Sequence, residues 1–140
     1  MTTYPWTHAF DSIAAPAAVV TAGLARFTVL TSRLIRLELD PTRTFEDRPS
    51  QAFWVRRLEV PPFTVEQTAT KFSLQTEHLR LEFDPQAREF TPLSLSITQR
   101  ASGVTWRPGL EDWGNLGGTY RTLDDATGRV RLEPGLISRS

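Results

Sequence analysis

The chain has 140 residues, enough for one domain that buries about two-thirds of the surface its unfolded form exposes. Sixteen basic residues balance sixteen acidic ones, so there is no net charge to attract nucleic acid or an anionic membrane surface. Cysteine is absent, which excludes disulfides, thiolate metal sites and cysteine nucleophiles from these residues. We therefore expect neither nucleic acid nor a membrane as a partner.

Residues 1–24 are predicted to form an N-terminal arm. The arm lacks the basic start and long apolar run of a signal peptide, and its apolar segment, residues 13–25, is too short to cross a bilayer. These features predict a cytoplasmic protein. Residues 13–24 are also the one arguable helix, although Pro16 and Gly23 disfavour it.

Residues 25–140 are predicted to form an antiparallel β-sandwich, which places the chain in the all-β class. Apolar and polar residues alternate along short segments, as they do in half-buried strands. The predicted strands are residues 26–31, 34–39, 52–57, 72–76, 79–83 and 93–98. Pro and Gly between these segments favour a sandwich or a barrel.

Part of this pattern occurs twice. The segment from Phe27 to Pro41 is echoed by the segment from Phe72 to Pro85, with a tight turn in the middle of each. Two such hairpins suit a fold in which two sheets pack face to face. An internal repeat and convergence on a common hairpin pattern explain the echo equally well.

Two pairs of adjacent carboxylates are the first candidates for chemistry, because carboxylates serve as general acids and bases and bind Ca²⁺. They are Glu46 with Asp47, and Asp124 with Asp125. Successive side chains diverge in an extended segment. A polar turn is therefore the favoured interpretation, more strongly for the first pair than for the second.

Other catalytic signals are missing. His8 lies in the arm and His78 in a predicted turn, so a histidine metal site is not expected. No serine nucleophile motif occurs, and the Gly117-Gly118 pair lacks the Lys and Ser or Thr of a phosphate loop. The residues therefore predict no catalytic residue, no metal and no cofactor.

Aromatic residues give the remaining candidates. Trp54, Trp106 and Trp113 could stack on sugar rings, although tryptophans in a sandwich of this size more often serve packing. Residues 113–128 combine Gly, Asn and Asp with Trp113 and Tyr120, a composition typical of an ordered functional loop on a rigid scaffold.

Four segments together resemble the N-terminal region of family 31 glycoside hydrolases, the α-glucosidase and α-xylosidase group. They are residues 33–39, 45–51, 115–124 and 135–140, and their order and spacing fit that family. The run Asn-Leu-Gly-Gly-Thr-Tyr-Arg-Thr-Leu-Asp, residues 115–124, is the most specific of them.

The resemblance implies a β-sandwich similar to galactose mutarotase, followed in the family by a (β/α)8 barrel that holds two catalytic aspartates of a retaining mechanism. The chain would then be an accessory N-terminal domain, cut short of its C-terminal boundary and inactive alone. Its partners would be the catalytic barrel of the same parent chain and an α-linked oligosaccharide or glycoside.

In this family the N-terminal domain lends a loop to the rim of the active site, and residues 112–125 are the best candidate. The resemblance makes Asn115, Arg121 and Asp124 candidates for hydrogen bonds to sugar hydroxyls, and Trp113 and Tyr120 candidates for covering a sugar face. The loop could equally serve only to pack on the barrel. The alternative function is an autonomous carbohydrate-binding module without catalysis; a free-standing aldose epimerase is disfavoured because its His and Glu site has no counterpart.

Overall fold

The computed structural model describes residues 10–50, 53–118, 128 and 132–135. The chain divides into two compact units, Met1–Pro108 and Gly109–Ser140, which are described separately below. No helix in the described part of the chain is long and apolar enough to span a membrane.

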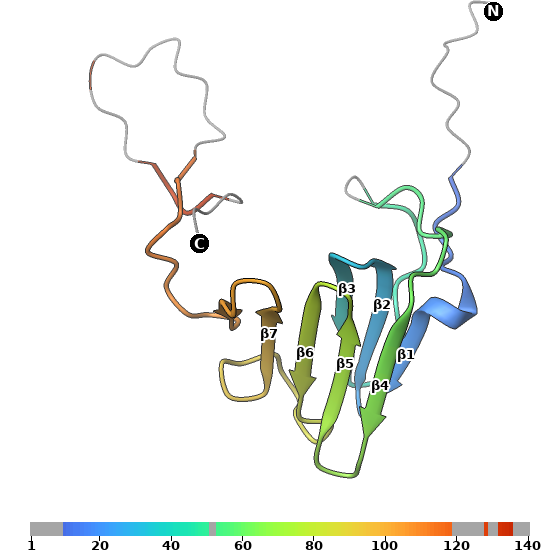
Figure 1. Ribbon diagram of the computed structural model, residues 1–140. Helices are drawn as coiled ribbons and strands as arrows, with labels where there is room; N and C mark the ends of the chain where they lie inside the picture. The colour runs from blue at the N-terminus through green and yellow to red at the C-terminus, as the bar shows by residue number, and fades with distance from the viewer. Residues whose placement is uncertain (1–9, 51–52, 119–127, 129–131, 136–140) are drawn as a thin grey trace, which may run out of the picture. The chain divides into compact units, whose positions relative to one another are not determined.

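The first unit is built from β-strands (Figure 1). Its described residues form one 3₁₀ turn, η1 (Pro16–Ala18), and the strands β1 (Val19–Ala22), β2 (Ala25–Thr31), β3 (Leu34–Leu39), β4 (Phe63–Gln67), β5 (Phe72–Thr76), β6 (Leu79–Phe83), β7 (Leu95–Gln99) and β8 (Thr105–Trp106).

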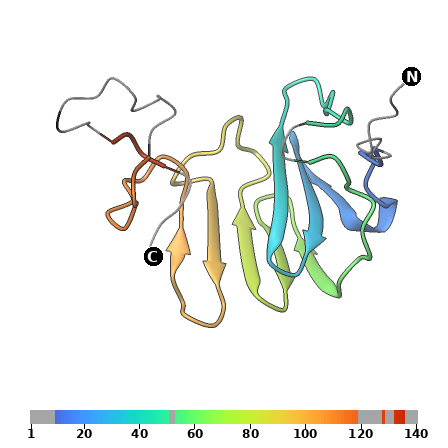
Figure 2. The ribbon, with the colours of Figure 1, turned by 90° about the horizontal axis from the view of Figure 1, so that it is seen from above.

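These strands form two antiparallel sheets, one in the order β1-β2-β3 and one in the order β4-β5-β6-β7-β8. The sheets lie face to face, as Figure 1 and the view from above in Figure 2 show. The predicted all-β class with an antiparallel β-sandwich is therefore confirmed.

The core lies between the two sheets and is made of alternate residues of β2, β5, β6 and β7. The Phe27 ring stacks on the Phe72 ring with centroids 4.8 Å apart, and Phe83 meets Phe27 edge-on. The buried core cluster consists of Ala22, Ala25, Phe27, Val29, Phe72, Leu74, Leu81, Phe83 and Leu95. Since each fully buried large apolar side chain contributes about 1.5–3 kcal/mol, this cluster dominates the stability of the first unit.

The two echoed segments form hairpins, one in each sheet, and their first phenylalanines are the stacked pair Phe27 and Phe72. Their registers differ. Phe27 pairs with Leu37, whereas Phe72 pairs with Phe83, and a bulge between Val29 and Thr31 occurs in the first hairpin. In the sequence echo, Leu37 corresponds to Leu81. A conserved register would therefore place Leu81 opposite Phe72, two residues before the observed partner Phe83.

Hydrogen bonds join the turns of the two hairpins. The Thr76 hydroxyl donates to the Ser32 carbonyl at 2.7 Å, and His78 Nδ1 lies 3.0 Å from the Ser32 hydroxyl. His78 Nε2 lies 2.6 Å from a guanidinium nitrogen of Arg33. His78 therefore has a structural role at the junction of the sheets.

Close backbone contact joins the sheets near the turn between β1 and β2. Gly23 has a φ of +58°, and a Cβ at this position would lie 1.9 Å from the Pro85 carbonyl oxygen. Only glycine fits here, because it accepts a positive φ and leaves room for the neighbouring backbone.

The prediction of a strand over residues 52–57 is wrong for the described residues 53–57. Val55 forms only an isolated bridge with Asp11, and the neighbouring Arg56 turns inward to bond backbone carbonyls. The strand expected at residue 93 begins at Leu95, because Ser94 bonds Thr91 in a turn and leaves Leu93 95% exposed.

Three strands were not expected from the pattern. β1 lies within residues 13–24, where a helix was arguable and where the arm was predicted to extend. Pro16 opens a short 3₁₀ turn there, and the next residues pair with β2. β4 follows Pro61-Pro62, and β8 is only two residues long.

Candidate functional site

The second unit contains the Gly-rich segment, and one side chain organises its described part. Asn115 Oδ1 accepts hydrogen bonds from the backbone N–H groups of Gly117 at 2.9 Å and Gly135 at 2.7 Å. Its Nδ2 donates to the Gly135 carbonyl at 2.8 Å. Gly118 and Glu133 exchange two backbone hydrogen bonds of 2.8 and 2.9 Å. We call this arrangement the Asn115 clamp.

Two glycines allow the clamp to close. Gly117 has a φ of +68°, and a Cβ there would approach the Leu132 Cβ to 3.0 Å. A Cβ on Gly135 would lie 2.9 Å from the Gly117 carbonyl oxygen. Gly117 is thus favoured by its turn geometry, and Gly135 is required by the close approach of two backbones.

A cavity of about 510 Å³ adjoins the clamp, within the range of small-molecule sites. It is lined by Leu110, Glu111, Asp112, Asn115, Leu116, Gly117, Leu132, Glu133 and Pro134. Carboxylates and leucines line this cavity together, and the Asp112 carboxylate already accepts hydrogen bonds from the Gly114 backbone N–H and the Asn115 amide. No group of His, Cys, Asp and Glu in the described part of the chain could hold a metal ion.

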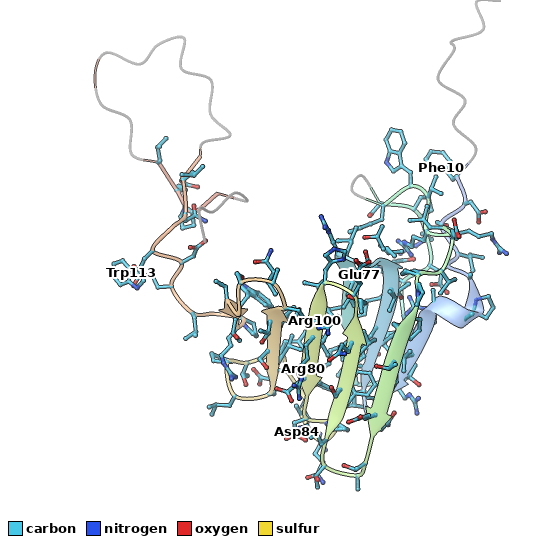
Figure 3. All side chains as sticks on the ribbon, in the orientation of Figure 1. Phe10, Glu77, Arg80, Asp84, Arg100 and Trp113 are labelled. Atoms are coloured by element: carbon cyan, nitrogen blue, oxygen red, sulfur yellow. The ribbon has the colours of Figure 1, made fainter. Side chains whose placement is uncertain are left out.

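The structure describes two of the five predicted sugar-binding residues, Trp113 and Asn115. Trp113 is 87% exposed, so one indole face is accessible (Figure 3). Asn115 uses its side-chain amide in the clamp, which makes it a positioning residue for the segment. Tyr120, Arg121 and Asp124 lie outside the described residues, so their roles stay predictions.

The two carboxylates of the Glu46-Asp47 pair point to different partners, as expected for a polar turn. Glu46 bonds the Arg48 side chain and its backbone N–H, and these bonds lower the pKa of Glu46 to about 2. Asp47 forms an ion pair with Arg26 at 2.8 Å. The pair is therefore not arranged as a joint acid and base.

Three arginines fix this turn to the outer face of the three-stranded sheet. Their side chains all donate to the Glu46 carbonyl, over 3.3 Å from Arg26, 3.1 Å from Arg36 and 2.9 Å from Arg56. Glu38 accepts two hydrogen bonds from Arg26, of 2.7 and 3.0 Å, and pairs with Arg36. We call Arg26, Arg36, Arg56, Glu38 and Asp47 the arginine cluster.

Sequence reasoning missed this cluster. The alternation in residues 34–39 places Arg36 and Glu38 on the face away from the core, where charged side chains usually meet water. The available signal was the position of Arg26 and Thr28 on the same face of the neighbouring strand, which the register brings opposite Glu38 and Arg36.

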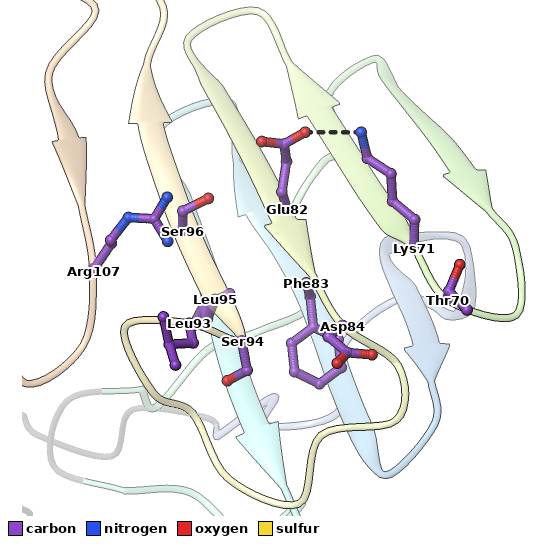
Figure 4. Close-up of a pocket in the computed structure, with 10 residues that line it drawn as sticks. All are labelled: Thr70, Lys71, Glu82, Phe83, Asp84, Leu93, Ser94, Leu95, Ser96 and Arg107. Carbon is purple, nitrogen blue, oxygen red and sulfur yellow. Dashed lines mark ion pairs between the residues drawn. The ribbon is translucent and has the colours of Figure 1, made fainter.

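The outer face of the five-stranded sheet is polar. Its register aligns Glu66, Ser73, Glu82 and Ser96 in one row across the strands. A cavity of about 310 Å³ is lined by residues of the inner strands β6 and β7 and of the adjoining segments, and Lys71 pairs there with Glu82 at 3.2 Å (Figure 4). No tryptophan lines this cavity, so it offers no indole for stacking on a sugar.

The other two candidate tryptophans lie in the first unit. Trp106 is on β8, and Trp54 packs edge-on against Phe10 with ring centroids 5.8 Å apart. Both side chains are about half exposed.

Comparison of the chain with models of known protein families and with curated protein sequences finds no match.

Proposed function

We propose that this chain is the accessory N-terminal β-sandwich of a retaining α-glycosidase, similar to family 31 glycoside hydrolases and to the mutarotase-like sandwich of that family. One observation carries the proposal: the four segments that resemble the family contact one another in two pairs. Arg36, in residues 33–39, bonds Glu46, in residues 45–51. Asn115, in residues 115–124, bonds Gly135 at the start of residues 135–140.

These contacts give the resemblance a physical basis. In each pair, a polar side chain from one segment bonds the backbone of the other, which requires both segments to be present at their observed spacing. The segments of each pair thus form one local structure, as the proposal expects of segments that belong to one unit.

In the proposed enzyme, the two catalytic aspartates belong to a (β/α)8 barrel of the same parent chain. The Asn115 clamp holds the Gly-rich segment in shape, and Trp113 covers a face of an α-linked sugar at the rim of the active site. Large apolar side chains that are exposed in the isolated chain, among them Leu93 and Leu110, fit a domain that packs on a partner.

The reading frame beyond codon 140 provides the first test. The proposal expects a barrel of several hundred residues with two catalytic aspartates. An unrelated domain, or a stop codon directly after Ser140, would overturn it. A second test uses the purified 140-residue chain, which should not hydrolyse 4-nitrophenyl α-glucoside; turnover by this chain alone would contradict the assignment.

In the parent enzyme, Trp113→Ala should raise KM about tenfold with a smaller change in kcat, because one stacking contact of about 1–1.5 kcal/mol is lost. Trp106→Ala is the matched control, since it removes a partly exposed indole from the first unit. Equal effects of the two substitutions would argue against a rim position for Trp113.

A carbohydrate-binding module without catalysis is the second candidate, favoured by the exposed indole of Trp113. Titration of the 140-residue chain with maltose and with isomaltose, followed by tryptophan fluorescence, separates the two functions. A saturable change that Trp113→Phe reduces would support the module. No change at millimolar sugar would leave the accessory domain as the better description.

A further inference from the structure

A small cavity lies beside the arginine cluster, on the side of the three-stranded sheet away from the core. Its volume is about 60 Å³, which exceeds the roughly 10–15 Å³ that one water requires. The lining residues are Ile13, Ala14, Val19, Arg26, Thr28, Arg36, Asp47 and Arg56. The cavity thus combines guanidinium groups, a hydroxyl and one carboxylate with apolar side chains.

The charges around the cavity do not balance. Arg26 pairs with Glu38 and Asp47, and Arg36 pairs with Glu38. No carboxylate of a described residue forms an ion pair with Arg56. Three guanidinium groups and two carboxylates therefore leave one positive charge.

Arg56 carries this excess charge in a buried position. Its side chain is 2% exposed and donates to the carbonyls of Glu46 and Arg48, and its Nε has no partner among the described residues. Burial and the nearby Arg36 charge lower the pKa of Arg56, and the more distant Glu38 and Asp47 carboxylates oppose this effect only in part. A buried charge without a direct ion pair is costly, so an additional anion would be favourable.

Thr28 offers a further donor at the same place. It is 2% exposed and lines the cavity, and its hydroxyl can donate one hydrogen bond. The remaining lining residues add no donor: Ile13, Ala14 and Val19, which neighbours Thr28 across β1 and β2, are apolar, and Asp47 is a carboxylate already paired with Arg26. The cavity therefore suits a small anion with a single centre.

We propose that this cavity binds one halide ion, chloride under physiological conditions. The ion neutralises the excess charge of the arginine cluster and accepts hydrogen bonds from the side chains of Arg56 and Thr28. It thereby stabilises the attachment of residues 45–48, and of the segment around Asp11 and Ala14, to the three-stranded sheet. This assignment does not depend on the glycosidase proposal.

The test measures thermal unfolding of the full 140-residue chain at constant ionic strength, with sodium chloride replaced stepwise by sodium gluconate, whose anion is too large for the cavity. The unfolding temperature should rise with chloride as mass action requires for a ligand of the folded state. Bromide should reproduce the rise. Equal unfolding temperatures in chloride and gluconate would overturn the proposal.

Arg56→Met keeps much of the side-chain volume and removes the excess charge, so it should abolish the chloride-dependent rise. Arg57→Met is the matched control, because Arg57 is the next residue, is exposed and pairs with Asp11 outside the cavity. Loss of the rise in both variants, or in neither, would contradict a site at Arg56.

Thr28→Val provides a second test should Arg56→Met fail to fold. The substitution conserves volume and removes the hydroxyl, so about tenfold or more chloride should be needed for the same rise. Line broadening of ³⁵Cl in nuclear magnetic resonance measures binding directly. Broadening that is unchanged by Thr28→Val would contradict a role of the hydroxyl in the site.

Discussion

Each of the two units of the chain is stabilised internally by a different kind of interaction. In the first unit, two sheets enclose stacked phenylalanines, and apolar burial supplies most of the stability. In the second unit, the described residues are organised by the side-chain amide of Asn115 and by close backbone contact at Gly117 and Gly135. The difference is that of a scaffold and a loop: burial makes the scaffold stable, whereas directional hydrogen bonds give the loop a defined shape.

The strongest way to test this comparison is to remove the centre of the scaffold. Phe27→Ala should lower the free energy of unfolding of the first unit by about 3–5 kcal/mol, because it leaves a cavity against Phe72 and Phe83. Urea unfolding followed by circular dichroism measures the loss. A loss below about 1 kcal/mol would show that the sheets do not depend on this contact.

Glycines with positive φ occur in both units and allow a direct comparison. Alanine at either position carries a strain of about 1–2 kcal/mol from the left-handed backbone alone. Gly23→Ala should cost more than Gly117→Ala, because its Cβ would meet the Pro85 backbone at 1.9 Å, whereas the Cβ at position 117 would meet the Leu132 side chain at 3.0 Å. Urea unfolding of both variants gives the order; equal losses would contradict the contact between Gly23 and Pro85.

Asn115→Ala tests the loop. Removal of the amide leaves the Gly117 and Gly135 backbone groups without their partner, which should cost about 1–3 kcal/mol locally. Hydrogen exchange at the Gly118 and Glu133 amides should accelerate about tenfold or more, while the urea midpoint of the first unit should stay unchanged. A fall in that midpoint would show that the two units are coupled in stability.

The smallest expected effect is a pH dependence at Glu46. Hydrogen bonds from Arg48 lower the pKa of Glu46 from 4.5 to about 2. A carboxylate with a lowered pKa stabilises the fold above its ordinary pKa, and this contribution is lost as the pH falls from 4.5 to about 2. Urea unfolding of the original chain and of Glu46→Gln across this range should show a shallower acid loss in the variant, small because Glu46 is exposed.

Much of the scaffold could be predicted from the sequence. Residues 34–39 and 79–83 alternate because one face meets the core, and the structure places strands at these positions. β4 could not be predicted as readily, since its alternation is limited to Phe63 and Val65 and two prolines precede it. The inward turn of Arg56 was not visible either, because a buried arginine depends on carbonyls contributed by residues 46 and 48, eight to ten positions away.

For the candidate site, the sequence indicated the segment but not the task of each residue. The Gly-rich composition predicted an ordered loop over residues 113–128, of which residues 113–118 and 128 are described. An asparagine has the same donors and acceptors whether it binds a sugar or a backbone, so only the structure assigned Asn115 to the clamp. Trp113 stays a prediction as a sugar contact, supported by its exposure.

The register of the two echoed hairpins has a consequence for ancestry. A faithful gene duplication preserves which residues pair, yet Phe27 meets Leu37 while Phe72 meets Phe83, two residues beyond the matching Leu81. A slide by two residues returns every side chain to the same face of the sheet, so selection for a buried face does not oppose it. The two hairpins are therefore alike in the alternation of their side chains more than in which residues pair. An alignment by sequence alone would match residues of β3 and β6 that do not occupy equivalent positions in the two hairpins.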